Sequence, residues 1–393
     1  MIQEIAASRR LVTQLVASRA RVSGARSLAV HPSGRELVAL TLDPRGRPSA
    51  ALVSRRGPGE HGPEWPAWPV HPDAYESEQA TVACGPEGDI HLAWLARSGA
   101  KGARWLLYTR SEDLGASWTA PTLLHDPRRD GDASEPQLSV DGQGRAHLVW
   151  SAARHGETPA RVWHAAADPR SAMSAPLALN SRGDARLARA SMNHAAAGVT
   201  AVAWIDERYL SPRARGGDVV VGVFDEPGAP PREQRLTYSG DAVTASVLVD
   251  RGGVLHATWA TAGGQVCYAQ STQGGQTWHD GAGAGMALEI QPTRGANPTL
   301  GLGLHPFREV IWLVWSVEDA ERYSGEPDGG LVFLVSPNTG AEWFEVGRIK
   351  RRLRGAVLSD LCAVEGADLR PRLCWSSSGA GSEDQVWFAE EER

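Results

Sequence analysis

Apolar residues recur along this chain in short runs, and six of these runs end in tryptophan. The six positions are spaced 54 to 60 residues apart: Trp94, Trp150, Trp204, Trp259, Trp315 and Trp375. One period before Trp94 lies Leu40, in the run ELVAL, which has the same pattern without a tryptophan. The chain therefore holds seven copies of one unit, with a period of about 55 residues.

Each unit contains four runs separated by turns. In the third unit LSV (138–140) meets the turn DGQG before the tryptophan-ended run, and VVVGVF (219–224) is the third run of the fourth unit. Short runs rich in β-branched and aromatic residues between Gly and Asp turns are typical of strands. Four antiparallel strands repeated radially form a propeller, whose blades bury their faces only against one another. We therefore predict one all-β domain, a seven-bladed β-propeller of four-stranded antiparallel blades, with six blades or a solenoid as alternatives.

The predicted blade boundaries follow the repeat. They lie at approximately 25–72, 78–126, 134–180, 186–238, 241–291, 296–350 and 354–393 within a single domain, 1–393. The seventh unit stops after its third run, QVWFAEEER, and the segment RRLVTQLV (9–16) alternates in polarity. We expect residues 9–17 to supply the missing outer strand and close the ring. A short amphipathic helix is the alternative, because Ile2, Ile5, Val12 and Val16 loosely form a helical stripe.

Composition narrows the class of partner. The 393 residues are 42% hydrophobic and 22% charged, with a net charge of -6 that gives no general attraction to nucleic acid or an acidic membrane. Charged residues interrupt the first twenty positions, and no segment is apolar enough to span a bilayer. These features favour a cytoplasmic protein. The four cysteines (Cys84, Cys267, Cys362 and Cys374) form no CxxC pair, so we expect reduced thiols, with a Cys362–Cys374 disulfide as the alternative.

Three turns between third and fourth runs share a signature. They read SEDLGASW (111–118), STQGGQTW (271–278) and SPNTGAEW (336–343). These turns resemble the Asp box, S-x-D-x-G-x-T-W, of the sialidase-like (BNR-repeat) β-propellers, with Gln273 and Asn338 in place of the aspartate in two copies. The matched residues are Ser111, Asp113, Gly115, Trp118, Ser271, Gly275, Trp278, Ser336, Asn338, Gly340 and Trp343.

The role of such a turn is structural. Its carboxylate or amide accepts hydrogen bonds from turn amides, its glycine permits a positive φ, and its tryptophan packs under the hairpin. The resemblance covers nearly the whole chain and implies the propeller fold. It also implies that these turns lie on the face opposite an active site.

The loops that join the second and third strands share the other face with the loops that join successive blades. Ligands usually bind at the mouth of the central channel on this face. We predict the ligand or partner site there, from Arg97, Arg154, Asp206, Glu207, Arg208, Tyr209, Glu321, Arg322 and Tyr323. The blade-joining loops add Asp130, Asp132, Glu135, Asp241 and Asn297.

A catalytic reading follows from the resemblance. Sialidases use three arginines to hold a carboxylate, a Tyr–Glu pair, and an aspartate as acid/base. The resemblance would assign these roles to Arg97, Arg154 and Arg208, to Tyr209 with Glu207 (or Tyr323 with Glu321), and to Asp206. The early Arg-Ile-Pro motif of the family is absent, since residues 25–28 read ARSL. We therefore assign no catalytic residue, and keep this set for the enzymatic alternative.

Two further patterns receive structural interpretations. His91, His147 and His256 stand three residues before their tryptophans, but equivalent positions on different blades lie too far apart to share one ion. We expect structural histidines, no metal and no cofactor. The run RIKRRLR (348–354) fits a charged edge strand, and a docking patch for an acidic partner is the alternative.

Three classes of function remain. We predict a non-catalytic binding or scaffold propeller that recruits a protein partner through its loop face, within a multi-component assembly. The first alternative is a lectin-like propeller that binds glycans. The second is a sialidase-like glycan-processing enzyme, a glycoside hydrolase or a polysaccharide lyase.

Overall fold

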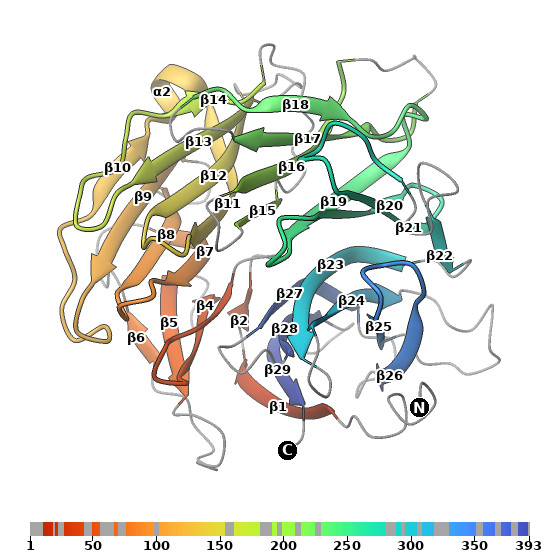
Figure 1. Cartoon of the computed structure of the whole chain (residues 1–393). Helices are drawn as coiled ribbons and strands as arrows, with labels where there is room; N and C mark the ends of the chain where they lie inside the picture. The colour runs from red at the N-terminus through yellow and green to blue at the C-terminus, as the bar shows by residue number, and fades with distance from the viewer. Residues whose placement is uncertain are drawn as a thin grey trace.

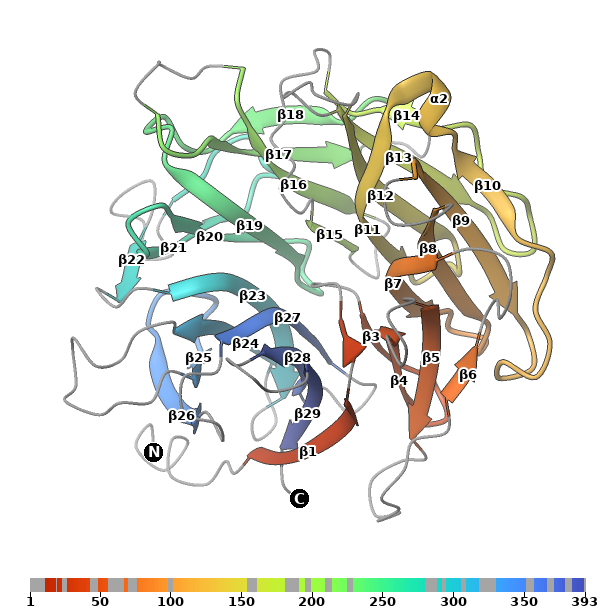
Figure 2. The same ribbon diagram turned by 180° about the vertical axis from the view of Figure 1, so that it is seen from behind.

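In the computed structural model, the described part of the chain forms seven antiparallel β-sheets arranged in a ring (Figures 1 and 2). The predicted seven-bladed propeller is confirmed, and the six-bladed and solenoid alternatives are wrong. The structure describes residues 11–18, 20–22, 27–42, 49–55, 67–69, 76–97, 102–153, 161–180, 191–194, 199–208, 214–224, 229–279, 288–291, 295–304, 309–317, 330–350, 357–365, 371–378 and 384–391.

The first three blades are consecutive along the chain. Blade 1 contains β2 (Ala20–Arg21), β3 (Leu28–Val30), β4 (Glu36–Leu42), β5 (Ser49–Arg55) and β6 (Ala67–Pro69). Blade 2 contains β7 (Glu76–Cys84), β8 (Ile90–Arg97), β9 (Arg104–Ser111) and β10 (Thr122–His125), and the short helix α2 (Pro127–Asp130) follows it. Blade 3 contains β11 (Asp132–Val140), β12 (Ala146–Ala153), β13 (Arg161–Ala167) and β14 (Leu177–Ala178).

The remaining blades repeat the same order of strands. Blade 4 contains β15 (Ser191–His194), β16 (Thr200–Asp206), β17 (Asp218–Phe224) and β18 (Arg232–Arg235). Blade 5 contains β19 (Ala242–Val249), β20 (Leu255–Thr261), β21 (Val266–Ser271) and β22 (Leu288–Gln291). Blade 6 contains β23 (Gly295–Leu304), β24 (Glu309–Val317), β25 (Gly330–Ser336) and β26 (Phe344–Lys350). Blade 7 contains β27 (Val357–Glu365), β28 (Pro371–Ser378) and β29 (Gln385–Glu391).

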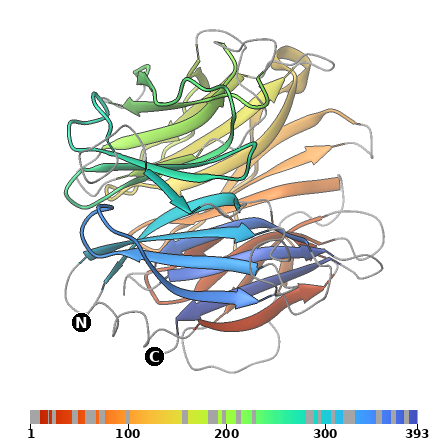
Figure 3. The same cartoon turned by 90° about the vertical axis from the view of Figure 1, so that its right-hand side faces the viewer.

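The outer strand of blade 7 comes from the other end of the chain. Strand β1 (Leu11–Ser18) pairs antiparallel with β29, from Leu11 opposite Glu391 to Ser18 opposite Gln385. Figures 1 and 3 show β1, in red, beside the dark blue strands of this sheet. The predicted strand closure is therefore confirmed, and the helical alternative is wrong for these residues.

The hydrophobic core is divided among the seven contacts between neighbouring blades. Each contact holds one cluster of buried side chains, and six clusters contain the repeated tryptophan of the second strand. Trp204 of blade 4, for example, is completely buried against Val149 and Val162 of blade 3. In the cluster between blades 7 and 1 the equivalent residue is Leu40, which lies with Phe388. The sequence repeat is thus a repeat of contacts with the preceding blade.

The three turns with the Ser-x-Asp-like signature share one pattern of hydrogen bonds. In each, the serine hydroxyl accepts the amide of the glycine four residues later, at 2.8 or 2.9 Å, and the tryptophan Nε1 donates to that glycine's carbonyl, at 3.1 or 3.2 Å. In the first turn, hydrogen bonds from the Ser117 hydroxyl and amide, and from Ser111, lower the pKa of Asp113 to about 2. The turns lie at the opposite ends of the strands from the blade-joining connections.

The structure describes the cysteines and the basic run at residues 348–354 only in part. Cys374 is buried and pairs in register with Cys362 across β27 and β28, while Cys84 and Cys267 are half-buried. Cys84, Cys267 and Cys374 form no disulfide, so the expected reduced thiols are confirmed for these three and the Cys362–Cys374 alternative is wrong. Strand β26 carries the start of the basic run, whose side chains also lie outside the described residues. Among the described residues no helix has the length and apolar character needed to cross a membrane.

The closing strand offers a matched pair of variants. Val16 packs against the cluster between blades 7 and 1, whereas Leu15 is exposed. Val16→Asp buries an unpaired charge at the seam, and we expect it to lower the free energy of unfolding by about 3 kcal/mol. Leu15→Asp should cost less than about 1 kcal/mol. Urea titrations of both variants measure the difference, and equal losses would contradict closure through β1.

Gly340 tests the contact between a turn and the preceding blade. A Cβ at Gly340 would lie 1.9 Å from the Tyr268 hydroxyl oxygen, and the residue has a φ of +91°. Gly34, with a φ of +82° and no atom within 4 Å of its Cβ position, is the control. We expect Gly34→Ala to cost about 1 to 2 kcal/mol and Gly340→Ala at least about 3 kcal/mol, because the second adds a clash to the same backbone strain. Unfolding midpoints that fall equally would show that Tyr268 yields freely.

Candidate functional site

The innermost strands of blades 2 and 3 are bulged near their first residues, on the face where blade-joining connections enter. In β7, Glu78 pairs with Leu95 but Thr81 pairs with Ala93, so two residues oppose Trp94. The bulged Gln79 has a φ of +52°, in the left-handed region that non-glycine residues rarely adopt. In β11, Glu135 stands at the equivalent bulge with a φ of +50°. Bulges of this kind re-aim side chains beside functional sites, and backbone strain concentrates there.

The two bulges are joined to each other. The Glu135 amide donates to Gln79 Oε1 at 2.8 Å, and Gln79 Nε2 lies 3.5 Å from Glu135 Oε1. Two residues further along, the Leu138 amide donates to Thr81 Oγ1 at 3.1 Å. These bonds satisfy edge amides that have no strand partner on the channel side. They also hold the bulged residues in fixed positions at the mouth.

Beside the bulges lies a group of paired charges, here termed the blade 2 ion cluster: Glu76, Glu78, Arg97 and Arg104. Arg97 Nε lies 3.1 Å from Glu76 Oε2, and its Nη2 lies 3.7 Å from Glu78. Arg104 Nε lies 3.0 Å from Glu78 Oε1, and its backbone amide donates to Asp132 at 3.2 Å. The side chains of Glu76, Glu78 and Arg97 are about one-fifth exposed, so the cluster presents fixed donors and acceptors to solvent.

In blade 4, Asp206 is completely buried at the end of β16. Its carboxylate accepts the Trp204 indole at 3.0 Å and the Arg208 Nε at 2.8 and 2.9 Å. Arg208 also binds Glu233 on β18 at 2.5 Å. Although burial lowers the pKa of Arg208, its hydrogen bonds to Asp206 and Glu233 raise it above the usual range. Asp206 is therefore an internal anchor that fixes Arg208 and Trp204.

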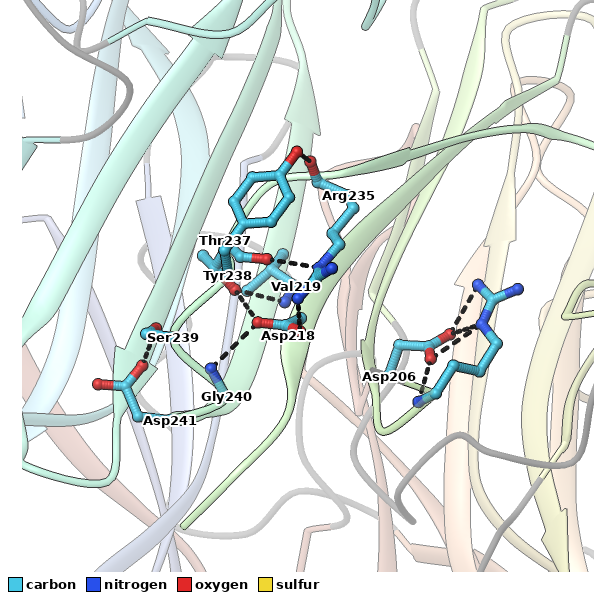
Figure 4. A network of polar contacts seen from close by, with 10 residues as sticks. Asp206, Asp218, Val219, Arg235, Thr237, Tyr238, Ser239, Gly240 and Asp241 are labelled. Carbon is cyan, nitrogen blue, oxygen red and sulfur yellow. Dashed lines mark hydrogen bonds and ion pairs between the residues drawn. The ribbon is translucent and has the colours of Figure 1, made fainter. Parts of the chain in front are cut away.

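Asp218, directly opposite Asp206 in the register of β16 and β17, anchors a different segment. It is completely buried and accepts Arg235 Nη2 at 2.7 Å, the Thr237 hydroxyl at 3.3 Å and the Gly240 amide at 3.1 Å (Figure 4). The Val219 amide donates to Thr237 Oγ1 at 2.9 Å. One buried carboxylate thus organises the connection from blade 4 to blade 5, residues 236–241, which we call the Asp218 loop.

The Asp218 loop displays an aromatic ring. Tyr238 is 63% exposed, and the Arg235 guanidinium carbon lies 4.4 Å from its ring centroid. Next to it, the Ser239 hydroxyl donates to the Asp241 carboxylate (Figure 4). The loop then enters β19, and the Ala262 amide donates to the Asp241 carbonyl at 2.7 Å. The ring and the carboxylate therefore belong to the face that carries the mouth.

The structure brings together only part of the predicted set. Arg97 belongs to the blade 2 ion cluster, Asp206 and Arg208 bind each other, and Glu207 is half-buried. Arg154, Tyr209, Glu321, Arg322 and Tyr323 lie outside the described residues, so their predicted roles stay predictions. The predicted arginine clamp would need Arg97 and Arg208 to be open to a ligand, but both hold carboxylates of their own.

Sequence reasoning missed Gln79, Asp218, Arg235 and Tyr238. Gln79 could have been found from its alignment with Glu135, one repeat later. Tyr238 follows the short fourth strand of blade 4, β18, and nothing in the sequence distinguishes it from an ordinary surface residue.

The three repeated histidines are internal hydrogen-bonding residues. His91 lies 2.6 Å from both Asp89 and Tyr108, and His256 lies 3.4 Å from Asp250 and 2.7 Å from Tyr268. In blade 3 a histidine replaces the tyrosine, so His147 lies between Asp141, at 3.3 Å, and His164, at 3.2 Å. Among the described residues no group of three His, Cys, Asp or Glu side chains is arranged to hold a metal ion.

These observations define an all-β propeller with a polar mouth and a loop-displayed aromatic ring. No protein-family model matches the chain, and no curated protein matches its sequence. Solved structures do match. A polysaccharide lyase described as an ulvan lyase is 12% identical, with a TM-score of 0.63, over 96% of this chain and 95% of that one.

Two other matches are also described as enzymes of glycans. The Penicillium chrysogenum α-L-arabinanase, complexed with arabinobiose, is 12% identical, with a TM-score of 0.55, over 96% of this chain and 98% of that one. The Trypanosoma rangeli sialidase is 12% identical, with a TM-score of 0.52, over 95% of this chain and 60% of that one. At these identities the likeness shows a shared β-propeller fold.

The blade 3 histidine pair predicts a pH-dependent stability. Burial, and next the neighbouring His147, lower the pKa of His164 to about 3. The unfolded chain protonates this residue near its ordinary pKa of 6.5. Between these values the unfolded state binds the extra proton, so the stability contributed by neutral His164 is present above pH 6.5 and lost as the pH falls. His164→Tyr, which copies Tyr108 and Tyr268 of blades 2 and 5, removes this loss.

We expect the wild type to lose about 2 kcal/mol more than His164→Tyr between pH 7 and pH 5, from this residue alone. Urea unfolding at both pH values measures the difference. Parallel losses in the two proteins would show that His164 takes up its proton in the folded state.

Proposed function

We propose that this protein is a glycan-recognition propeller whose ligand binds at the channel mouth, on the face of the blade-joining connections. The observation that carries the proposal is the pair of bulges at Gln79 and Glu135, held in left-handed conformations beside the blade 2 ion cluster. Strained backbone next to partly exposed, fixed polar groups is characteristic of a binding site.

The chemistry of this surface suits sugar hydroxyls. Carboxylates accept hydrogen bonds, guanidinium groups donate in a fixed plane, and a glutamine amide does both. Because Arg97 and Arg104 are paired with glutamates, their charges are compensated and their guanidinium planes are held in place. Hydroxyl-rich, uncharged groups match such a surface better than an isolated anion does.

The comparisons add independent support. The ulvan lyase, the arabinanase and the sialidase share this fold and are all described as acting on glycans. The repeated serine–glycine and tryptophan–carbonyl hydrogen bonds support assigning the three turns as Asp boxes of that superfamily. In this proposal the three turns stabilise the blades and do not contact the ligand.

Recognition is proposed rather than cleavage. Hydrolysis by paired carboxylates needs an acid and a base or nucleophile that both face the sugar. Among the described residues, Asp206 and Asp218 are completely buried and Glu76 and Glu78 are held by arginines. Their geometry makes them anchors. The competing proposal is the protein-recruiting scaffold that the sequence led us to expect. A cytoplasmic location was expected together with that scaffold and stays a proposal.

The test is a glycan array, followed by titration calorimetry with the fragments that bind. Arg97→Gln should weaken binding at least about tenfold, because the variant loses a planar donor and releases Glu76, while Arg104 still holds Glu78. Arg170→Ala, an exposed residue near the turns of the opposite face, should leave affinity unchanged. Both variants are checked for an unchanged melting temperature.

Mass spectrometry of the bound fragments distinguishes the outcomes. Intact fragments support recognition, and fragments shortened by the protein show an enzyme instead. A blank array, or equal affinity of Arg97→Gln and wild type, refutes the proposal and leaves the protein-recruiting scaffold in its place.

A further inference from the structure

We propose that Tyr238 is a stacking platform for a second sugar ring, so that the ligand is an extended oligosaccharide chain rather than a single terminal sugar. This inference rests on the proposed function, and it adds the length of the ligand and the subsite that senses it. The platform lies in the Asp218 loop, between blades 4 and 5, whereas the bulges at the mouth lie on blades 2 and 3.

The exposure of Tyr238 is the first argument. Among the described residues it is the most exposed large hydrophobic side chain, at 63%, ahead of Leu123 at 49% and Leu15 at 38%. Those two leucines lie on outermost strands, at the rim of the propeller. Tyr238 instead lies on a blade-joining connection, three residues before Asp241 and four before the innermost strand β19. The loop therefore lies on the face of the blade-joining connections, and within it the Tyr238 ring lies over Arg235, at the end of the outermost strand β18.

Rigidity is the second argument. The residues around Tyr238 are bound to the buried Asp218 through Arg235, Thr237 and Gly240. Arg235 also donates to the Thr237 carbonyl at 3.0 Å, and the same guanidinium stacks on the tyrosine ring. A ring fixed before binding loses little entropy when a ligand stacks on it. An ordinary exposed tyrosine needs no buried carboxylate to hold its loop.

The groups around the Tyr238 ring also suit a sugar. Sugar rings present apolar C–H faces edged by hydroxyls, and aromatic rings pack against such faces while nearby polar groups bind the hydroxyls. The hydrogen-bonded Ser239 and Asp241 stand beside Tyr238 on the way to the mouth. The Arg235 guanidinium covers part of the Tyr238 ring, and its positive charge is paired with the Asp218 carboxylate. The exposed part of the ring therefore suits the uncharged face of a sugar.

The two subsites lie on different blades. Gln79 and Glu135 lie near the start of the innermost strands of blades 2 and 3, whereas the Asp218 loop is anchored on blade 4 and leads into the innermost strand of blade 5. Figure 1 shows β7 and β11 separated from β19 by β15. A ligand that contacts both must cross the mouth.

The experiment is a length series of arabinan fragments, which are uncharged, from one to eight sugar units, titrated into the whole protein. Wild-type affinity should rise with length until the chain reaches Tyr238. In Tyr238→Ala this rise should disappear, with about a tenfold loss for the longest fragments and no change for the shortest. Tyr238→Trp should retain the rise, and Leu123→Ala, which removes an exposed apolar side chain elsewhere, should match wild type.

Each outcome bears on one proposal. If fragments bind but Tyr238→Ala weakens short and long ones equally, or weakens none, the extended-ligand inference is wrong and recognition at the mouth survives. If no fragment of any length binds, the inference is refuted together with its premise. Length-dependent binding that Tyr238→Ala abolishes and Tyr238→Trp preserves establishes the platform.

Discussion

The structure depends on one contact repeated around the ring, the packing of the second-strand tryptophan against the preceding blade. A four-stranded sheet cannot bury its two faces alone, so a blade is stable only between neighbours. Trp94, Trp150 and Trp204 each supply the largest buried side chain to one such contact. Leu40 takes this place at the seam, where the smaller side chain is accompanied by a second closing device, the pairing of β1 with β29.

The same tryptophan is linked to the geometry of the mouth. In blades 2, 3, 6 and 7 the register of the innermost strand skips two residues opposite it, and these begin with Gln79, Glu135, Asn297 and Asp360. The tryptophan that holds neighbouring blades together therefore lies opposite the irregularity in the innermost strand. Packing between blades and the shape of the channel-facing strand are linked at one position of the repeat.

Repetition explains how much the sequence could predict. A period of about 55 residues and short alternating runs were sufficient for the blade count, the strand order and the closure by residues 11–18, because each follows from burial on two faces. The site was harder, because a carboxylate looks the same in sequence whether it binds a ligand or anchors a loop. Asp206 and Arg208 stood in a long charged loop and were natural candidates, yet Asp206 is completely buried beneath Trp204 and Arg208. That distinction depends on burial, which single-sequence patterns do not reveal.

Residues that depart from the repeat are therefore the best candidates for a function beyond the fold. The histidines at 91, 147 and 256 recur with equivalent partners, which accounts for them as part of the blade. Asp218, by contrast, accepts hydrogen bonds from Arg235, Thr237 and Gly240. The loop held in this way carries the exposed side chain of Tyr238. A buried carboxylate costs free energy unless its hydrogen bonds are satisfied, and here the donors are Arg235, at the end of β18, and Thr237 and Gly240 of the Asp218 loop. Such an arrangement stabilises the loop that carries the exposed ring of Tyr238.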